Sequence, residues 1–575
     1  MKRPGGFALA GTLAALIGLL ELSSARPAAA CGGFFCSQQG AVNQAAEGVI
    51  FSDNGDGTIT AVIEIQYQGP AELFSWLLPL GSVPGTDDVK VSSNQAFARL
   101  RAATAPQYQL NRRVEGTCRE GSGSPTGGSG GLSGGFGGSG GTGSGPSGVV
   151  TVEAAGVAGA FEWTVISVDD TVADPAAPAT QWLTENGYDV PAGSEALLGP
   201  YLADGMYLLA LRLTKGADTG AIRPIEITYA ADAAMIPLKL TAVAATPDMG
   251  VMTWLLSSSR AVPYNYNALE LNEARINWFA PQSNYAQVVI EAADEAGGQG
   301  FVTEFAAPTN QLGSGRIWSA NDEDGWAGLP NRTPSRAVEL LTRLDSVYRG
   351  WSGLSDAFRR NIQLPEGITF EEFQACVTCY AADVSFDSSA LVDAVDEEVI
   401  APMRRAQALI DRAPYVTRLY TTLSAAEMTV DPVFLFNPDL GNVSNVHGAD
   451  WVIECNGDVF ESEAPWRIEL PQGTTIRGAG SDRTWPDTFG TQPANVRVLT
   501  LSTTGAGAVV ADNRDLINAS VADYNAGFPP GSATSGGGGS CAATPGASPR
   551  TLPGALALVA SVLGGIALWR RRRRA

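Results

Sequence analysis

Histidine is almost absent from this chain of 575 residues, since His447 is the only one. Zinc sites built from several histidines and His-Glu-x-x-His proteases are therefore excluded within one chain. A Ser-His-Asp triad would have to use His447 with Asp450 or Asp439, and no Gly-x-Ser-x-Gly elbow stands between a strand and a helix. We expect His447 to be a hydrogen-bonded loop residue, and we predict no catalytic residue, no metal and no cofactor.

Positive charge is also scarce. The chain has 37 lysines and arginines against 59 aspartates and glutamates, a net charge of −22. Because Arg550 and Arg570 to Arg574 lie in the C-terminal tail, the rest of the chain is more acidic still. An acidic surface repels nucleic acid and anionic lipid. The composition therefore argues against nucleic-acid binding.

Residues 1–30 have the pattern of a secretory signal peptide. Lys2 and Arg3 precede an apolar run over residues 7–22, and small residues ending at Ala30 supply a cleavage site before Cys31. This pattern predicts a secreted protein. An alternative is a lipoprotein signal in which Cys31 is the acylated residue.

The tail at residues 541–575 has the parts of a sorting signal. A Gly/Ser-rich stalk leads to Cys541, an apolar run at 552–569 and five arginines. This run of 18 residues is at the lower end of the length that crosses a membrane, which is about 20 residues. The arginines would stay on the cytoplasmic side. The tail resembles the myxobacterial C-terminal sorting domain (MYXO-CTERM), which implies a sorting protease acting near Cys541, surface delivery and lipid modification. An ordinary single-pass membrane anchor is the alternative.

The other cysteines are candidates for disulfide bonds, because exported chains form them readily. They are Cys31, Cys36, Cys118, Cys376, Cys379 and Cys455. We favour the local pairs Cys31–Cys36 and Cys376–Cys379, which leaves Cys118 with Cys455. The spacing of Cys376 and Cys379 also matches a redox motif, and a zinc site using both with Cys118 and Cys455 is a further alternative. The position of the two cysteines inside a predicted helix favours a structural disulfide.

Between its two signals the chain predicts a mixed α+β body with sandwich-like sheets. The Gly/Ser-rich stretch 121–148 cannot bury enough apolar surface to fold and is expected to be a disordered linker. Residues 62–67 (VIEIQY) resemble residues 224–229 (PIEITY), which indicates either two related β-units or a chance similarity of β-rich segments. The expected parts are β-rich segments at 31–120 and 149–310, a mainly helical part at 311–415, a β-rich part at 416–512 and a flexible stalk at 513–540.

Short motifs mark several local structures. Residues 53–57 (DNGDG) predict a hairpin turn between two strands, and their acidic residues do not have EF-hand spacing. Ser93 is expected to cap a helix that ends before Pro106. Residues 369–372 (TFEE) form a capping box, which predicts a helix start.

Several segments together resemble the exported bacterial family called domain of unknown function 2330. They are residues 31–36 (CGGFFC), 67–70 (YQGP), 74–79 (FSWLLP), 182–188 (WLTENGY), 235–240 (MIPLKL), 272–278 (NEARINW) and 297–305 (GGQGFVTEF). The resemblance covers about residues 31–310 and extends toward Pro438. It implies export and surface association, without an assigned activity or active-site residues.

The remaining chemical candidate is an acidic, aromatic stretch. Asp322, Glu323 and Asp324 lie beside Trp318 and Trp326, a combination that can bind sugar or calcium, although a solvated loop is the simpler expectation. We hypothesise an exported protein anchored at the outer membrane or surface of a Gram-negative cell, with a non-enzymatic binding, adhesion or structural role and an unidentified protein or glycan ligand. The alternative is a carboxylate-based surface hydrolase acting on carbohydrate.

Overall fold

The structure is a computed structural model that describes residues 43–68, 75–119, 149–188, 190, 193–214, 222–243, 245–313, 316–329 and 334–529. The signal peptide, the Cys31–Cys36 pair, the linker at 121–148, Cys541 and the apolar run at 552–569 lie outside these residues. No helix within the described ranges has the length and apolar character needed to cross a membrane.

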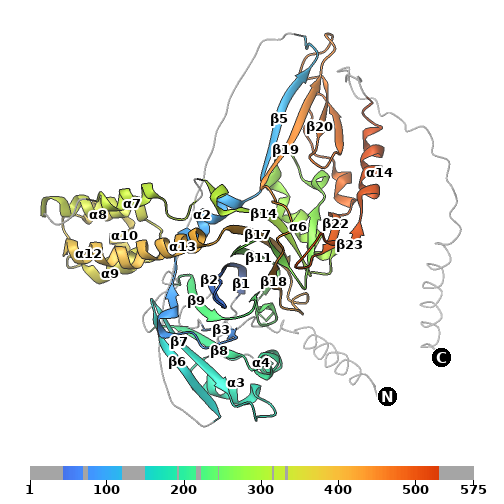
Figure 1. Cartoon of the computed structure of the whole chain (residues 1–575). Coiled ribbons are helices and arrows are strands. Elements are labelled where there is room, and N and C mark those ends of the chain that lie inside the picture. Colours follow the sequence, from blue (N-terminus) through green and yellow to red (C-terminus); the bar gives the residue numbers. More distant parts are fainter. Residues whose placement is uncertain are drawn as a thin grey trace, which may run out of the picture.

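A ten-stranded sheet forms the centre of the molecule (Figure 1). It combines parallel and antiparallel neighbours, since β1 runs parallel to β11 and antiparallel to β2. In spatial order its strands are β23 (Ala508–Asp512), β22 (Asn495–Thr500), β13 (Asn267–Leu271), β14 (Gly300–Pro308), β17 (Tyr415–Leu423), β11 (Ala245–Ser257), β1 (Asn43–Asp53), β2 (Thr58–Gln68), β9 (Ile225–Ala230) and β4 (Val89–Val91). The mixed α+β class is therefore as predicted.

The strand order places the two similar segments in the same sheet. Strand β2 pairs directly with β9, with Val62 opposite Glu226 and Ile63 opposite Ile225. The two similar segments are thus neighbouring strands of one sheet. Strands β22 and β17 come from the last third of the chain and enter the same sheet, so the β-rich segments are interwoven.

Alternate residues of the central strands face two different cores. Val49 and Phe51 pack against a second sheet, whereas Ile50 and Val62 face helices, as expected when successive side chains point to opposite sides of a sheet. The second sheet has the order β3 (Ser75–Leu80), β8 (Tyr207–Leu213), β7 (Phe161–Val168) and β6 (Val150–Ala158). Helices α3 (Ala176–Glu185) and α4 (Ser194–Ala203) cover its outer face through a separate core.

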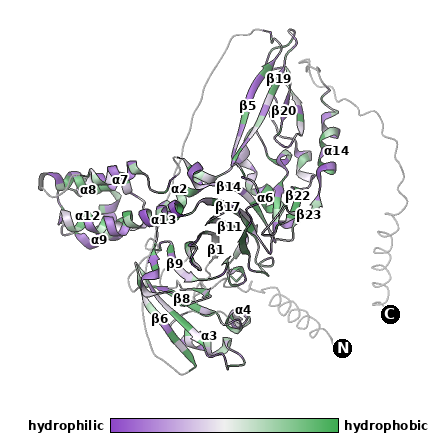
Figure 2. Ribbon diagram, viewed as in Figure 1, coloured by the Kyte–Doolittle hydropathy of each residue, from purple (hydrophilic) through white to green (hydrophobic). Residues whose placement is uncertain are grey.

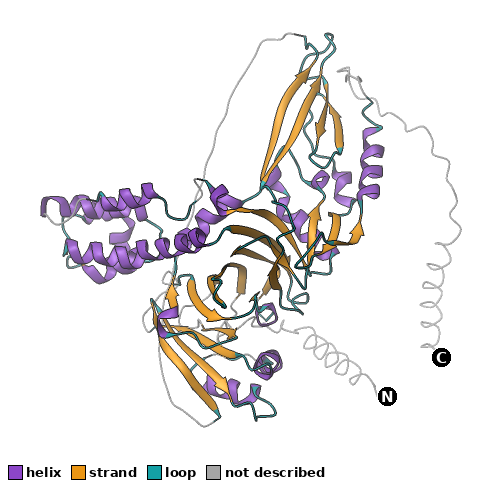
Figure 3. Ribbon diagram, viewed as in Figure 1, coloured by secondary structure: helices purple, strands orange, loops and turns teal. Residues whose placement is uncertain are grey.

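A helical arm projects from the central sheet (Figures 1 and 3). Its helices combine hydrophilic and hydrophobic residues (Figure 2), which suits elements with one buried face. One contact between the arm and the sheet is an ion pair. Arg223, just before β9, has a side chain that is 1% exposed, and its Nη1 lies 2.7 Å from Glu398 of the arm. Its elements are α7 (Ala320–Ala327), α8 (Pro334–Tyr348), α9 (Leu354–Asn361), β15 (Ile362–Gln363), α10 (Phe370–Ala375), α11 (Val377–Tyr380), β16 (Ser385–Phe386), α12 (Ser388–Val395), a π-turn (Asp396–Ile400) and α13 (Ala401–Arg412), with α2 (Asn94–Thr104) at its base.

A second arm consists of four strands. They are β21 (Thr475–Ala479), β20 (Pro465–Glu469), β19 (Val446–Glu454) and β5 (Gln107–Glu115). Strands β5 and β19 run parallel although more than 300 residues separate them. Helix α14 (Arg514–Asn525) packs Ile517 and Val521 into the core beneath this sheet. The flexible stalk therefore does not begin at residue 513, because these apolar side chains give that stretch a buried helical face.

Shorter elements complete the body. Helix α6 (Tyr285–Glu295) covers the β13, β14 and β17 region of the central sheet. The others are α5 (Leu238–Thr241), β10 (Ala234–Met235), β12 (Ala261–Pro263), β18 (Val433–Phe436) and the 3₁₀ turns η2 (Thr86–Asp88), η4 (Glu273–Arg275), η5 (Pro281–Ser283), η6 (Thr309–Leu312) and η8 (Asp487–Thr491).

Candidate functional site

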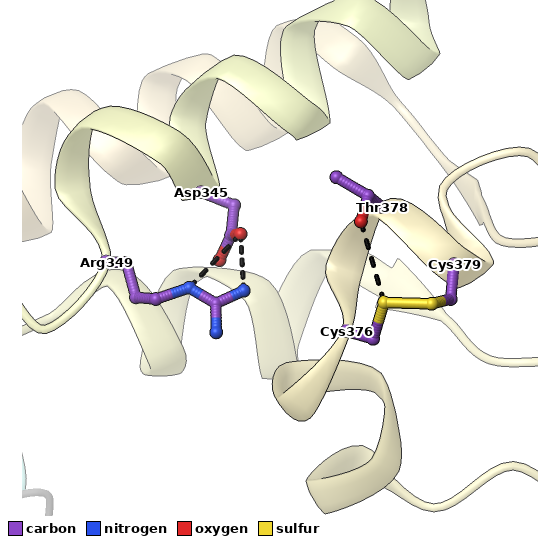
Figure 4. Close-up of a disulfide and its surroundings, with 5 residues drawn as sticks. All are labelled: Asp345, Arg349, Cys376, Thr378 and Cys379. Carbon is purple, nitrogen blue, oxygen red and sulfur yellow. Dashed lines mark hydrogen bonds and ion pairs between the residues drawn. A yellow bond between two sulfur atoms is a disulfide. The ribbon is translucent and has the colours of Figure 1, made fainter.

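The described cysteines form two disulfide bonds, in agreement with the expected pairs. Cys118 is joined to Cys455 with their Cα atoms 4.9 Å apart, beyond the ends of β5 and β19. Cys376 is joined to Cys379 between α10 and α11, and Thr378 Oγ1 lies 3.5 Å from the Cys376 sulfur (Figure 4). Because the two bonds lie in different arms, a zinc site made from all four cysteines is ruled out.

The acidic, aromatic stretch of the helical arm is a set of structural contacts. Asp322 accepts hydrogen bonds from both terminal nitrogens of Arg99 at 2.8 and 2.9 Å. Glu323 accepts from Arg404 and from the Trp318 indole N–H, at 2.6–2.8 Å. Burial would raise the pKa of the Asp322 carboxyl, but the bonds from Arg99 help to lower it to about 2. Asp322 thus binds α2 through Arg99, and Glu323 binds α13 through Arg404. Within the described residues no group of three or more acidic, histidine or cysteine side chains is placed to hold a metal ion.

The strongest candidate site is a cleft of about 450 Å³ where the four-stranded arm leaves the central sheet. Residues of β5, β19, β13, β14 and α6 line it, and these elements meet at the root of the arm (Figure 1). Its polar lining includes Tyr108, Arg260, Glu270, Glu273, Tyr285, Glu304, His447 and Arg497. The cleft thus gathers ionisable groups from segments far apart in the sequence.

His447 lies near the start of β19 and not in a loop. Its Nδ1 is 2.6 Å from Glu273 Oε1, and its ring stacks on Tyr108 with the centroids 4.6 Å apart. Neither aspartate proposed for a triad contacts it in the described structure: Asp439 accepts a hydrogen bond from the Gly505 amide, and Asp450 lies 3.6 Å from Arg113. The carboxylate partner is Glu273, which the sequence did not identify.

A buried network adjoins this pair. Glu304 Oε2 is 2.5 Å from Arg418 Nε, and the two side chains are 1% and 5% exposed. The Tyr285 hydroxyl donates to the other Glu304 oxygen at 2.5 Å. Burial raises the pKa of Glu304 and, together with the Glu304 charge, raises the pKa of Tyr285 well above its ordinary value. This buried network therefore forms part of the wall of the cleft.

Two further charged groups sit on the open side. Arg497 binds Glu270 through two hydrogen bonds of 2.7 and 2.8 Å, and each side chain is about one-third exposed. Arg260, in contrast, makes no ion pair with any described residue: its Nη1 donates to the Gly441 carbonyl at 3.0 Å, and Nη2 lies 3.4 Å from Thr303 Oγ1. Arg260 is therefore the cation of the cleft that forms no ion pair within the described residues, and the nearby charge of Glu270 only partly offsets the lowering of its pKa by burial.

These contacts limit the chemistry that the cleft can perform. A glycosidase of the two-carboxylate type needs one free acid and one free base or nucleophile beside the substrate. Here Glu270 is bound by Arg497, and Glu304 is buried beneath Arg418 and Tyr285. The third carboxylate, Glu273, is held by His447. The arrangement suits the recognition of a polar ligand better than proton transfer to one.

The sequence contained partial signals for this site. Glu273 and Glu304 lie in residues 272–278 and 297–305, two of the segments that carry the family resemblance. Nothing local showed that these segments meet His447 and Arg497. These residues come together only in the fold, because β13 pairs with β22 and β14 in the central sheet and β19 begins beside the same cleft.

Fold and site together define a mixed α+β protein with a charged cleft between a central sheet and a β-arm. A family model described as "Uncharacterized protein conserved in bacteria (DUF2330)" matches residues 25–312, half of the chain. The chain belongs to this family. No curated protein and no solved structure matches this chain. The matched residues supply Tyr108, Arg260, Glu273 and Glu304 to the cleft, whereas His447 and Arg497 come from the part beyond them.

Proposed function

We propose that this chain is an exported, surface-anchored binding protein without catalytic activity, whose cleft takes a small polar ligand. The N-terminal signal and the Cys541 tail support export and anchoring. Two disulfide bonds, one of them linking residues 337 positions apart, are also typical of an oxidising compartment. The ligand would meet the protein at the root of the β-arm.

One observation carries the binding role. Each carboxylate lining the cleft already has a protein partner, whereas the cation Arg260 forms no ion pair within the described residues. Binding sites of this kind combine apolar walls with a few placed polar groups. Here Val302, Leu440 and Leu499 supply apolar wall.

The alternative, a surface hydrolase, rests on the presence of three glutamates in one cleft. The exported chain would be incubated with p-nitrophenyl glycosides and p-nitrophenyl acetate, and we expect release of nitrophenol at the rate seen in buffer. The matched variants are E270Q, E273Q and, on the surface away from the cleft, R316Q. Turnover that E270Q or E273Q abolishes and R316Q retains would overturn the binding role in favour of hydrolysis.

Surface anchoring has its own test. Changing Cys541 to Ala should leave the protein in the envelope instead of on the surface, because the residue at which the tail is processed is lost. Protease shaving of intact cells, with an antibody against the body, measures this difference. Unchanged surface exposure of the Cys541→Ala protein would reject the role of Cys541 in sorting.

A further inference from the structure

Arg260 shows what the cleft lacks. Its Nε is buried and has no hydrogen-bond partner among the described residues. Nη1 donates to the Gly441 carbonyl at 3.0 Å, and Nη2 makes only a long contact of 3.4 Å with Thr303 Oγ1. Burial lowers the pKa of the guanidinium, which nonetheless keeps its charge. The residue as a whole is only partly buried, and a guanidinium is stabilised by an anion that accepts two of its hydrogen bonds. The geometry therefore calls for a carboxylate-type group at Arg260.

Glu273 shows the opposite deficit. This residue is 5% exposed, and its Oε1 is bound by His447. Its other oxygen, Oε2, is buried and has no donor within the described part of the chain. A buried carboxylate oxygen left without a donor is costly, so this atom calls for a hydrogen-bond donor, and preferably a cationic one.

We propose that the cleft binds a small zwitterion of the amino-acid type, with its carboxylate on Arg260 and its ammonium on Glu273. This inference rests on the binding role proposed above and names the ligand class. The other charged groups of the cleft form ion pairs, Glu270 with Arg497 and Glu304 with Arg418. The two groups that remain for a ligand, the Arg260 guanidinium and the second oxygen of Glu273, have opposite charges. Leu440, Leu499 and Leu501 form an apolar wall for a side chain.

The size of the cleft leaves two sources for this chemistry. A volume of about 450 Å³ accepts a free amino acid with accompanying water, or a dipeptide. Both carry one ammonium and one carboxylate, and they differ in the distance between the two charges. Binding of leucine and of leucyl-leucine therefore distinguishes the two sources.

Isothermal titration calorimetry of the exported chain, with its disulfides intact, provides the test. The probes are L-leucine, leucyl-leucine, 4-methylpentanoate (leucine without its amine) and 3-methylbutylamine (leucine without its carboxylate). We expect one of the two zwitterions to bind and each single-charge analogue to bind roughly 10-fold to 100-fold more weakly, the range for loss of one charged hydrogen bond.

Variants assign the two contacts. R260Q should weaken binding of the zwitterion by roughly 10-fold or more. R260K should recover part of this loss, because lysine retains the positive charge but cannot bind a carboxylate through two parallel N–H groups. E273Q should weaken it similarly, since an amide N–H would replace an acceptor facing the ammonium. R316Q, a surface arginine paired with Asp411, should leave binding unchanged.

Several results would overturn this assignment. They are the absence of heat with both zwitterions, equal binding of a single-charge analogue, or unchanged binding in R260Q and E273Q. Thermal melting checks that the variants fold. If R260Q does not fold, binding to E273Q tests the proposal. If neither zwitterion binds and the nitrophenyl substrates are not hydrolysed, only the proposed ligand class is rejected. If the nitrophenyl substrates are hydrolysed in a way that depends on Glu270 or Glu273, the proposed binding role itself is rejected.

Discussion

Neutralising Glu304 alone should destabilise the protein more than removing the whole ion pair with Arg418. The two side chains are 1% and 5% exposed and meet at 2.5 Å. The guanidinium also donates to the Arg101 carbonyl at 3.1 Å and to Thr104 Oγ1 at 3.2 Å. In E304Q the Tyr285 hydroxyl keeps its acceptor, but Arg418 becomes a buried, uncompensated charge. Breaking such a pair costs about 3–5 kcal/mol.

The pair requires a double-mutant cycle. E304Q and R418M should each lower the free energy of unfolding by about 3–5 kcal/mol, and the double variant should lose no more than either single variant, because no unpaired charge remains. Urea unfolding at pH 7, with disulfides intact and circular dichroism as the signal, measures all three. Additive losses in the double variant would refute this account.

A matched surface pair serves as the control. Arg316 and Asp411 lie 3.2 Å apart with side chains 53% and 52% exposed. Solvent screens such pairs, so R316Q and D411N should each change the free energy of unfolding by about 0–1 kcal/mol. A surface effect as large as that of Glu304 would show that burial is not the cause.

Two other perturbations test the arms. The Asp322 pKa of about 2 lies below its ordinary value of 3.8, because the effects of Arg99 and the hydrogen bonds from Ser319 together outweigh burial. An acid with a depressed pKa stabilises the fold above its unfolded pKa, so wild type should lose about 1 kcal/mol, after allowance for solvent screening, between about pH 4 and pH 2. A melting series across this range should show no such loss in D322N. Replacing Cys118 and Cys455 by Ser should free the ends of β5 and β19 and lower the stability of this arm by about 2–5 kcal/mol. Trypsin should then cut the ends of these strands at least about tenfold faster than in wild type. Equal cutting rates would contradict a stabilising role of this disulfide bond.

Local signals in the sequence determined local structure. Ser93 caps α2 as predicted, with its hydroxyl accepting from the Gln95 amide at 3.3 Å. Thr369 and Glu372 form the expected capping box of α10. The turn at 53–57 joins β1 to β2, and the Gly55 amide donates to Asp53. In each case the interacting groups lie within a few residues of one another, so their spacing alone is sufficient.

The sequence alone also indicated the mixed α+β class, the family and the two described disulfide pairs. The alternation of apolar residues shows that a strand has two faces, but it does not name the neighbouring strand. Only the tertiary structure paired β2 with β9 and placed the strands from the end of the chain beside β13. It also gave residues 514–525 a buried face.

The cleft depends on this long-range order. Tyr108, Arg260, Glu273 and His447 come from segments up to 339 positions apart and share no local pattern. Whether a charged side chain has a counter-ion is decided by its neighbours in space, because Coulomb energy and desolvation depend on distance and burial. The sequence therefore supplied the charged residues. The fold alone decided that, among the described residues, Arg260 forms no ion pair and the second oxygen of Glu273 has no hydrogen-bond donor.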